Sequence, residues 1–192
     1  MGGITREMDV RTSILIQPIG YVEEFILEEL VQLISESIEA DVILSSTRLP
    51  PNLALYDWNR GQYKGELVLD WINKITSNYS FDRILGICGF DAYAGNLNFI
   101  FGIASMYTGK CLVFLHRLRS EHRLYVQRTL KESLHELGHT FGLHHCVNKR
   151  CVMSFSNSII EVDRKEARFC RVCAERASRR GLVLKEPAIL ET

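Results

Sequence analysis

The chain has 192 residues, of which 46% are hydrophobic and 24% charged, and its 23 basic and 23 acidic side chains cancel to a formal net charge of zero. This length and composition are typical of one globular domain and exclude intrinsic disorder. The lack of net positive charge disfavours a dedicated nucleic-acid binder or a protein held on an anionic membrane. Because no apolar run reaches the roughly 18 to 20 residues that span a bilayer, and residues 1–11 lack the pattern of a signal peptide, we expect a cytoplasmic protein.

The first half of the chain alternates between strand-like apolar runs and apolar residues at helical spacing. The expected elements, in chain order, are a strand at 13–19, a helix at 21–38, a strand at 41–44, a long surface loop at 50–61, a helix at 63–75 and a strand at 83–88. Strands that alternate with helices favour βαβ units and a mostly parallel sheet.

The second half breaks this alternation. Residues 97–106 and 110–116 are both strand-like, and the three residues between them are too few for a helical crossover, so we expect an antiparallel hairpin. Residues 121–143 form the longest helical pattern, and a short helix is expected at 174–180. The prediction is an α/β (α+β) fold with a twisted mixed sheet, an antiparallel edge strand and three principal helices.

We expect two parts within one compact catalytic domain. Residues 1–145 would form the sheet and the long helix, and residues 146–192 a cysteine-rich C-terminal subdomain that is organised by metal. Two further cysteines, Cys88 and Cys111, stand alone inside apolar runs and are expected to be buried strand residues.

The segment at 135–145 reads His-Glu-Leu-Gly-His-Thr-Phe-Gly-Leu-His-His and lies at the end of the long helical pattern. On a helix, His135 and His139 lie about 40° apart and one turn along the axis, so both imidazoles can reach one Zn²⁺ at about 2.0 to 2.1 Å. Glu136 is rotated by about 100° from His135, to a position beside the metal where it can take a proton from a zinc-bound water.

A catalytic zinc needs a third protein ligand and one open position. A straight helix carries the chain away after His139, but Gly142 permits a helix-ending conformation with positive φ that allows the chain to turn back. We expect His145 to complete the set because it fits the H-x-x-G-x-x-H spacing, and His144 is the competing candidate.

Four cysteines form a second cluster in the C-terminal part of the chain. Cys146 and Cys151 are separated by four residues, and Cys170 and Cys173 by two. Two short pairs of thiolates are typical of a closed, tetrahedral and therefore structural zinc site. A redox dithiol at the second pair and an iron–sulfur cluster are the alternatives, and the presence and spacing of two pairs favour zinc.

Residues 135–173 resemble the archaemetzincin family of zinc peptidases, whose signature joins the extended histidine motif to Cys-x4-Cys-x-Met and a later Cys-x-x-Cys. The resemblance is weaker over residues 98–105, and the first eighty residues add only a compatible order of elements. It implies a metzincin-like fold, two zinc ions, a Met-turn at Met153 beneath the catalytic zinc, and an edge strand at 97–106 along which an extended peptide binds. Some metzincins carry a tyrosine two residues after that methionine, whereas this chain has Phe155.

The leading hypothesis is a zinc metallopeptidase in which Glu136 activates a zinc-bound water for attack on a peptide bond. The alternative is a scaffold of the same fold that binds peptides or protein termini with little or no turnover. A third reading, a zinc-ribbon-like module for nucleic acid, is disfavoured by the neutral charge and the lack of interleaved basic and aromatic residues. We therefore expect a peptide or protein partner, no nucleic acid, no membrane, and a monomer.

Overall fold

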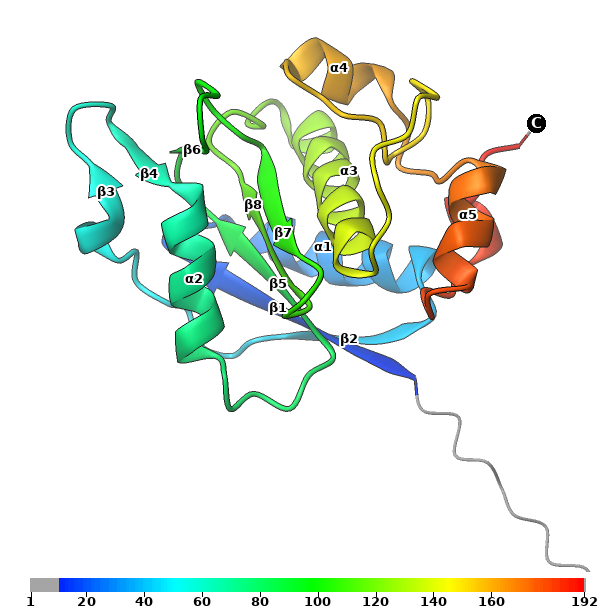
Figure 1. Ribbon diagram of the computed structural model, residues 1–192, viewed down its shortest axis with the longest axis horizontal. Helices are drawn as coiled ribbons and strands as arrows, with labels where there is room; N and C mark the ends of the chain where they lie inside the picture. Colours follow the sequence, from blue (N-terminus) through cyan, green and yellow to red (C-terminus); the bar gives the residue numbers. More distant parts are fainter. Residues whose placement is uncertain (1–10, 192) are drawn as a thin grey trace, which may run out of the picture.

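The computed structural model describes residues 11–191 (Figure 1). The N-terminal segment from which the absence of a signal peptide was inferred therefore lies almost entirely outside the described residues. None of the helices within 11–191 has the length and apolar content needed to cross a membrane.

A five-stranded sheet forms the centre of the molecule, with the order β2-β1-β5-β8-β7. The strands are β1 (Thr12–Ile19), β2 (Ala40–Leu44), β5 (Arg83–Cys88), β7 (Gly102–Ser105) and β8 (Lys110–Phe114). All neighbouring strands are parallel except β7, which pairs antiparallel with β8 at one edge. The predicted mixed sheet with an antiparallel edge strand is confirmed.

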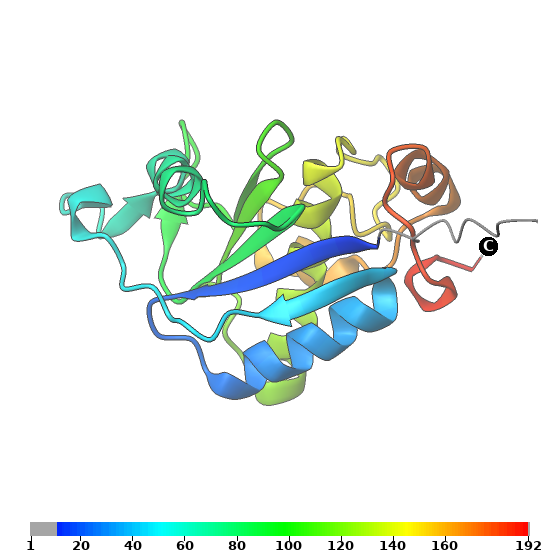
Figure 2. The same cartoon turned by 90° about the horizontal axis from the view of Figure 1, so that it is seen from below.

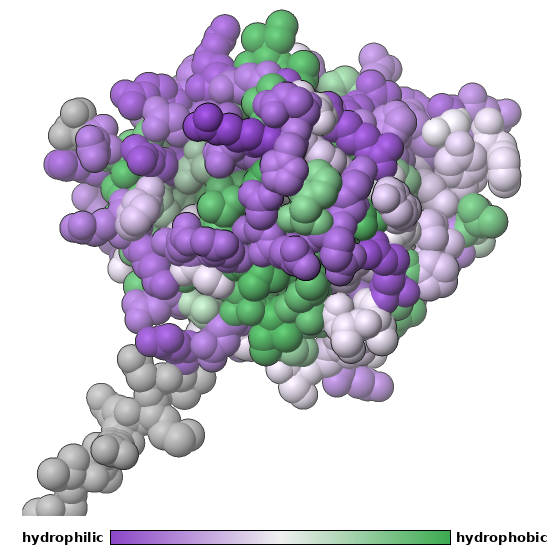
Figure 3. All heavy atoms as spheres, turned by 180° about the vertical axis from the view of Figure 1, so that it is seen from behind, coloured by the Kyte–Doolittle hydropathy of each residue, from purple (hydrophilic) through white to green (hydrophobic). Residues whose placement is uncertain are grey.

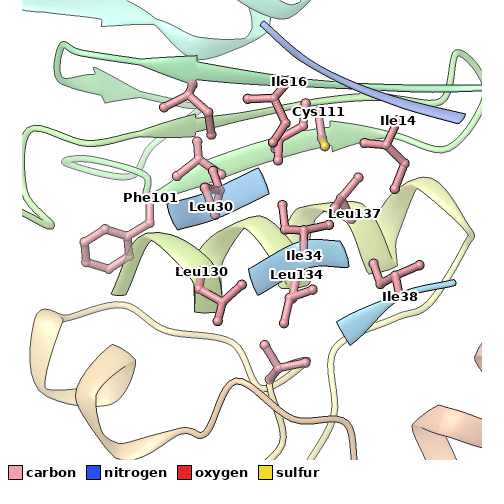
Figure 4. Packing of buried hydrophobic residues seen from close by; sticks show 14 of the residues in the cluster. Ile14, Ile16, Leu30, Ile34, Ile38, Phe101, Cys111, Leu130, Leu134 and Leu137 are labelled. Carbon is pink, nitrogen blue, oxygen red and sulfur yellow. The ribbon is translucent and has the colours of Figure 1, made fainter. Parts of the chain in front are cut away.

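Helices cover both faces of this sheet (Figure 2). The helices α1 (Glu24–Ser37) and α3 (His122–Thr140) lie on one face, and α2 (Gly65–Ile75) lies on the other. Apolar side chains of α1 and α3 meet those of β1 and β8 in the larger core cluster (Figure 4). Residues labelled there are Ile14, Ile16, Leu30, Ile34, Ile38, Phe101, Cys111, Leu130, Leu134 and Leu137. Both Cys88 and Cys111 are fully buried strand residues, as predicted.

The expected surface loop at 50–61 is wrong in part, because it contains ordered elements. A 3-10 turn, η1 (Leu53–Leu55), leads into β3 (Tyr56–Asp57), which pairs antiparallel with β4 (Gln62–Lys64), and β6 (Ala92–Tyr93) completes a small second sheet. Asp57 closes the β3–β4 hairpin, since its Oδ1 accepts hydrogen bonds from the N–H groups of Asn59 and Arg60. Gly61 ends the turn at a φ of 68°, which only glycine adopts at little cost.

The edge strand is shorter than the expected 97–106. Only residues 102–105 pair with β8, and the preceding residues run as a loop beside the small sheet. Side chains of the β3–β4 hairpin donate hydrogen bonds to the carbonyl groups of Leu97 and Asn98. Further along the loop, the N–H of Ile100 donates to the carbonyl of Ala92 in β6, and the carbonyl of Phe101 accepts from the N–H of Phe114 in β8.

The C-terminal part adds α4 (Ile159–Arg164), α5 (Arg171–Ser178) and the 3-10 turn η2 (Glu186–Ala188). The helix expected at 174–180 thus begins and ends earlier. The helix α4 was not expected, although its start has a sequence signal in Ser158 and Glu161. The Ser158 hydroxyl accepts from the N–H of Glu161, and the Glu161 carboxylate accepts from the N–H of Asn157. The larger core cluster includes residues from this part as well as from the sheet. The face opposite that of Figure 1 is covered mainly by hydrophilic side chains, with apolar groups between them (Figure 3).

Candidate metal centre and active-site cleft

The end of α3 carries the histidine motif in a buried setting. The helix ends at Thr140, and Gly142 takes a φ of 79°, as its position in the sequence predicted. Two backbone hydrogen bonds close this turn, from the N–H of Gly142 to the carbonyl of His139 and from the N–H of Leu143 to the carbonyl of Gly138. The chain therefore reverses and returns His145 to the helix.

Three imidazoles converge at this point: those of His135, His139 and His145. One ring nitrogen from each lies within 4.8 Å of the others. The Nε2 atoms of His135 and His139 are 3.0 Å apart. His144 does not join this group: its side chain lies with Arg179 and Arg180 in a separate depression.

The hydrogen bonds of the two helical histidines fix which nitrogen is free. Nδ1 of His135 is 2.8 Å from the carbonyl oxygen of Val152, and Nδ1 of His139 is 2.7 Å from that of Leu143. A carbonyl oxygen only accepts, so both Nδ1 atoms donate and both Nε2 atoms carry lone pairs. Burial lowers the pKa of His135 well below its ordinary value and that of His139 to about 4, so both rings are neutral.

Two lone pairs that face each other at this distance repel unless a cation lies between them, and both nitrogens are positioned to bind one. Ligand nitrogens of a tetrahedral Zn²⁺ lie about 3.3 Å apart, given Zn–N distances of about 2.0 to 2.1 Å. The separation of the two Nε2 atoms is close to that value. The donor set of neutral imidazoles therefore fits zinc, and His145 offers a third ring nitrogen at the same point.

Glu136 lies beside the histidines and is only 5% exposed. Its carboxylate lies against the edge strand: a Cβ at position 102 would lie 2.5 Å from Oε1 of Glu136, so only glycine leaves room for it there. Burial raises the pKa of Glu136 well above its ordinary value, and the charge of Glu132, one turn earlier, adds to the rise. A neighbouring divalent cation would oppose both effects and favour the carboxylate.

A buried ion pair lies next to the motif. The ammonium group of Lys165, 1% exposed, is 2.9 Å from Oε1 of Glu132 and also donates to the carbonyl of Ser154. Such a pair is stable in the interior only because each charge compensates the other. It joins α3 to the chain after α4. Sequence reasoning missed Glu132, Lys165 and Gly102, and no local pattern marks them.

Met153 is completely buried beneath the helix end. A Cβ at Gly138 would lie 2.5 Å from the Met153 sulfur, so only glycine permits the close packing of the helix on that methionine. Phe155 follows, with its ring centroid 5.0 Å from that of His145. The Met-turn that the family resemblance implies at Met153 stays a prediction.

The four clustered cysteines also converge. The Sγ atoms of Cys146, Cys151, Cys170 and Cys173 all lie within 4.8 Å of one another, and those of Cys146 and Cys170 are 3.7 Å apart. Sulfur ligands of a tetrahedral zinc lie about 3.8 Å apart, given a Zn–S distance of about 2.3 Å. Hydrogen bonds from Cys173 and from the N–H of Cys170 lower the pKa of Cys151 to about 5, which favours a thiolate there. These side chains fit a closed structural zinc site.

The cysteine and histidine clusters share one loop. Cys146 directly follows His145, and its N–H donates to the carbonyl of Met153. Val152, whose carbonyl accepts from His135, lies between Cys151 and Met153. The cysteines therefore lie in the same segment as the backbone group that orients His135.

A cleft of about 260 Å³ runs between the edge strand and the motif. It is lined by Ala94, Leu97, Phe99, Ile100, Phe101, Gly102, Ile103, Ala104, Glu132, His135, Glu136, His139, His145, Phe155, Ser156 and Asn157. None of the described residues that line it is a tyrosine. The Tyr93 hydroxyl donates to Asp57, and Tyr107 is exposed in the β7–β8 turn.

The sequence of this chain was compared with protein families and with known proteins, and the matches are zinc-peptidase relatives. A model of peptidase family M54 matches residues 13–179. The chain is 37% identical over 182 residues to the archaemetzincin of Saccharolobus solfataricus, an alignment that covers 91% of this chain and 97% of that protein. It is 40% identical over 178 residues to the archaemetzincin of Methanocaldococcus jannaschii, covering 89% and 96%.

The fold is similar to that of the archaemetzincin crystal structure from Methanopyrus kandleri, with a TM-score of 0.80, 36% identity, and coverage of 88% of this chain and 95% of that one. Fold and site together define a zinc metallopeptidase. The chain belongs to peptidase family M54, the archaemetzincins, and the resemblance inferred from its sequence is confirmed.

Proposed function

We propose that this chain hydrolyses peptide bonds in the cleft between β7 and α3, with His135, His139 and His145 as the ligands of a catalytic zinc and Glu136 as the general base. The observation that carries the proposal is the pair of Nε2 lone pairs that face each other at 3.0 Å beside a buried carboxylate. The zinc would be held by three side chains and open on the side of the cleft.

The bound zinc would polarise the peptide carbonyl and lower the pKa of water in the cleft. Glu136 takes a proton from the attacking water on its carboxylate oxygen and then gives it to the amine that leaves. Gly102 and the end of α3 fix the position of that carboxylate, which favours proton transfer along one path. Because Phe155 has no hydroxyl, that side chain donates no hydrogen bond to the developing oxyanion.

The edge strand supplies the binding surface for substrate. β7 pairs with β8 on one side only, and its residues 102–104 line the cleft on the other. An extended peptide gains main-chain hydrogen bonds at such an edge, and the substrate is therefore a peptide or an unfolded segment of a protein.

Cys146, Cys151, Cys170 and Cys173 would hold a second, structural zinc, so the holoenzyme contains two zinc ions per chain. Residues 146–192 then act as a zinc-stapled subdomain that positions His145 and Met153. The supporting observation is the convergence of the four Sγ atoms in a segment joined to the histidines by adjacent residues.

The test is Glu136→Gln, which keeps the size of the side chain and removes its basicity. Cleavage of a peptide library should fall by at least about 100-fold, while elemental analysis shows unchanged zinc. The control is Glu175→Gln, an exposed glutamate of α5, which should cleave at the parental rate. Undiminished cleavage by zinc-loaded Glu136→Gln would refute the mechanism, and full zinc occupancy in a parent that cleaves nothing would support the peptide-binding alternative.

A further inference from the structure

The loop at 94–101 forms one wall of the cleft, although it belongs to neither sheet. Its side chains Leu97, Phe99 and Phe101 line the cleft. Arg60 donates to the carbonyl groups of Leu97 and Asn98 at 3.3 and 3.1 Å, and Gln62 donates to that of Asn98 at 3.0 Å. The β3–β4 hairpin thus holds the backbone of this wall from behind.

The ring of Phe99 has its own support, from Arg117 after the end of β8. The guanidinium carbon of Arg117 lies 4.4 Å from the centroid of the Phe99 ring. Nε and Nη2 of the same guanidinium donate to both oxygens of Asp91, at 2.8 to 3.1 Å. A guanidinium fixed at two points presents a flat face on which an aromatic ring stacks.

Asp91 connects the two supports. Its Oδ2 accepts from Gln62 at 3.0 Å as well as from Arg117, and its side chain is only 10% exposed. Phe99 also contacts Phe101 edge to face, with ring centroids 5.2 Å apart. The Phe99 ring therefore contacts both a fixed cation and a buried ring.

The cleft that this ring borders leaves apolar surface uncovered. Leu97 and Phe155 both line it, and they remain 40% and 42% exposed. An apolar side chain of a bound peptide would cover such groups and gain the free energy of removing them from water. A small polar side chain would not.

We propose that Arg117 is a positioning residue for substrate specificity: by stacking on Phe99 it holds the wall of a subsite for a large apolar side chain next to the cleaved peptide bond. The inference rests on the proposed peptidase function and adds its substrate class, peptides with a large apolar residue beside the cleaved bond. Without the guanidinium, the Phe99 ring keeps only its contact with Phe101, can adopt other rotamers, and the subsite loses its shape.

The experiment uses zinc-loaded full-length protein and a set of peptides in which leucine or serine occupies each position flanking the cleaved bond in turn. The parent should cleave the best leucine peptide with a kcat/KM at least about tenfold above its serine counterpart. Arg117→Ala should reduce this ratio to below about threefold, by slowing cleavage of the leucine peptide and leaving the serine peptide within about twofold of the parent.

Arg119→Ala is the matched control, since Arg119 lies two residues further on, is about as exposed as Arg117 and pairs with Glu23 away from Phe99. It should keep the parental ratio. Arg117→Lys retains the positive charge but loses the planar guanidinium that stacks on Phe99 and donates twice to Asp91, so it should behave like Arg117→Ala. Should Arg117→Ala fail to fold, Phe99→Ala tests the same subsite and should lower the ratio equally.

The inference is overturned if the parent shows no preference, if Arg117→Ala slows both peptides equally, if Arg119→Ala has the same effect, or if Phe99→Ala leaves the ratio unchanged. These outcomes leave the proposed peptidase function intact. Cleavage of neither peptide by the zinc-loaded parent would overturn the proposed function and the inference together.

Discussion

The contact between Gly102 and Glu136 gives the sharpest test of how the base is held. A Cβ at position 102 would lie 2.5 Å from Oε1 and Cγ of Glu136, whereas ordinary contacts of a Cβ begin near 3.4 Å. Gly102→Ala therefore pushes the carboxylate aside by about 1 Å. A displacement of this size at a reacting group costs about 100-fold in rate, so we expect kcat to fall about 100-fold.

The assay is steady-state cleavage of one peptide by the parent, Gly102→Ala, Glu136→Gln and the double variant, with zinc content measured in parallel. Because the alanine acts through Glu136, the double variant should be no slower than Glu136→Gln alone, and zinc should stay at the parental level. If Gly102→Ala cleaves as fast as the parent, or if the two losses multiply in the double variant, the carboxylate is not positioned by this contact.

Three further predictions concern the surrounding structure. Cys173→Ser should leave one zinc per chain by elemental analysis and slow peptide cleavage at least severalfold, because the cysteine cluster holds the loop of the third histidine; two zinc ions or unchanged kinetics would contradict this. Gly138→Ala, which raises the stability of an ordinary helix by about 1 kcal/mol, should here lower the free energy of unfolding by about 1 to 2 kcal/mol in urea, since its Cβ would overlap the sulfur of Met153. The pKa of Asp163 is lowered by its hydrogen bonds from Arg128. The pair therefore stabilises the protein fully above the unfolded-state pKa near 3.9 and loses this effect as the pH falls through the lower pKa of the folded state. Asp163→Asn should thus cost about 1 kcal/mol at pH 7 and less at pH 3, and an equal cost at both values would show that the charge is not involved.

Much of the sheet and of the metal clusters follows from local sequence patterns. Apolar runs and helical spacing predicted the parallel strands, the helix α3 and the β7–β8 hairpin because each pattern reports which face of one element is buried. The histidines were predictable because the ligand geometry of zinc depends on spacing along one helix and on a glycine at its end. The same holds for the paired cysteines.

The remaining features depend on contacts between distant segments. Arg60 and Gln62 support a loop more than thirty residues further along the chain. Local patterns do not reveal such a contact, and for this reason a strand was expected at 97–101 and a loop at 50–61. In the sequence, Glu132 and Lys165 are not distinguished from ordinary surface charges. Only the folded structure shows that both are buried and paired. Gly102 likewise matters only because the carboxylate of a later helix lies against it.

The central claim is that three histidines bind one zinc ion and leave it open to the cleft. The most direct measurement is a zinc-edge anomalous difference map from crystals of the metal-loaded protein. We expect one peak at about 2.0 to 2.1 Å from Nε2 of His135, His139 and His145, with no fourth protein ligand, and a second peak among the four cysteine sulfurs. Absence of the first peak, or a first peak enclosed by four side chains, would contradict the account.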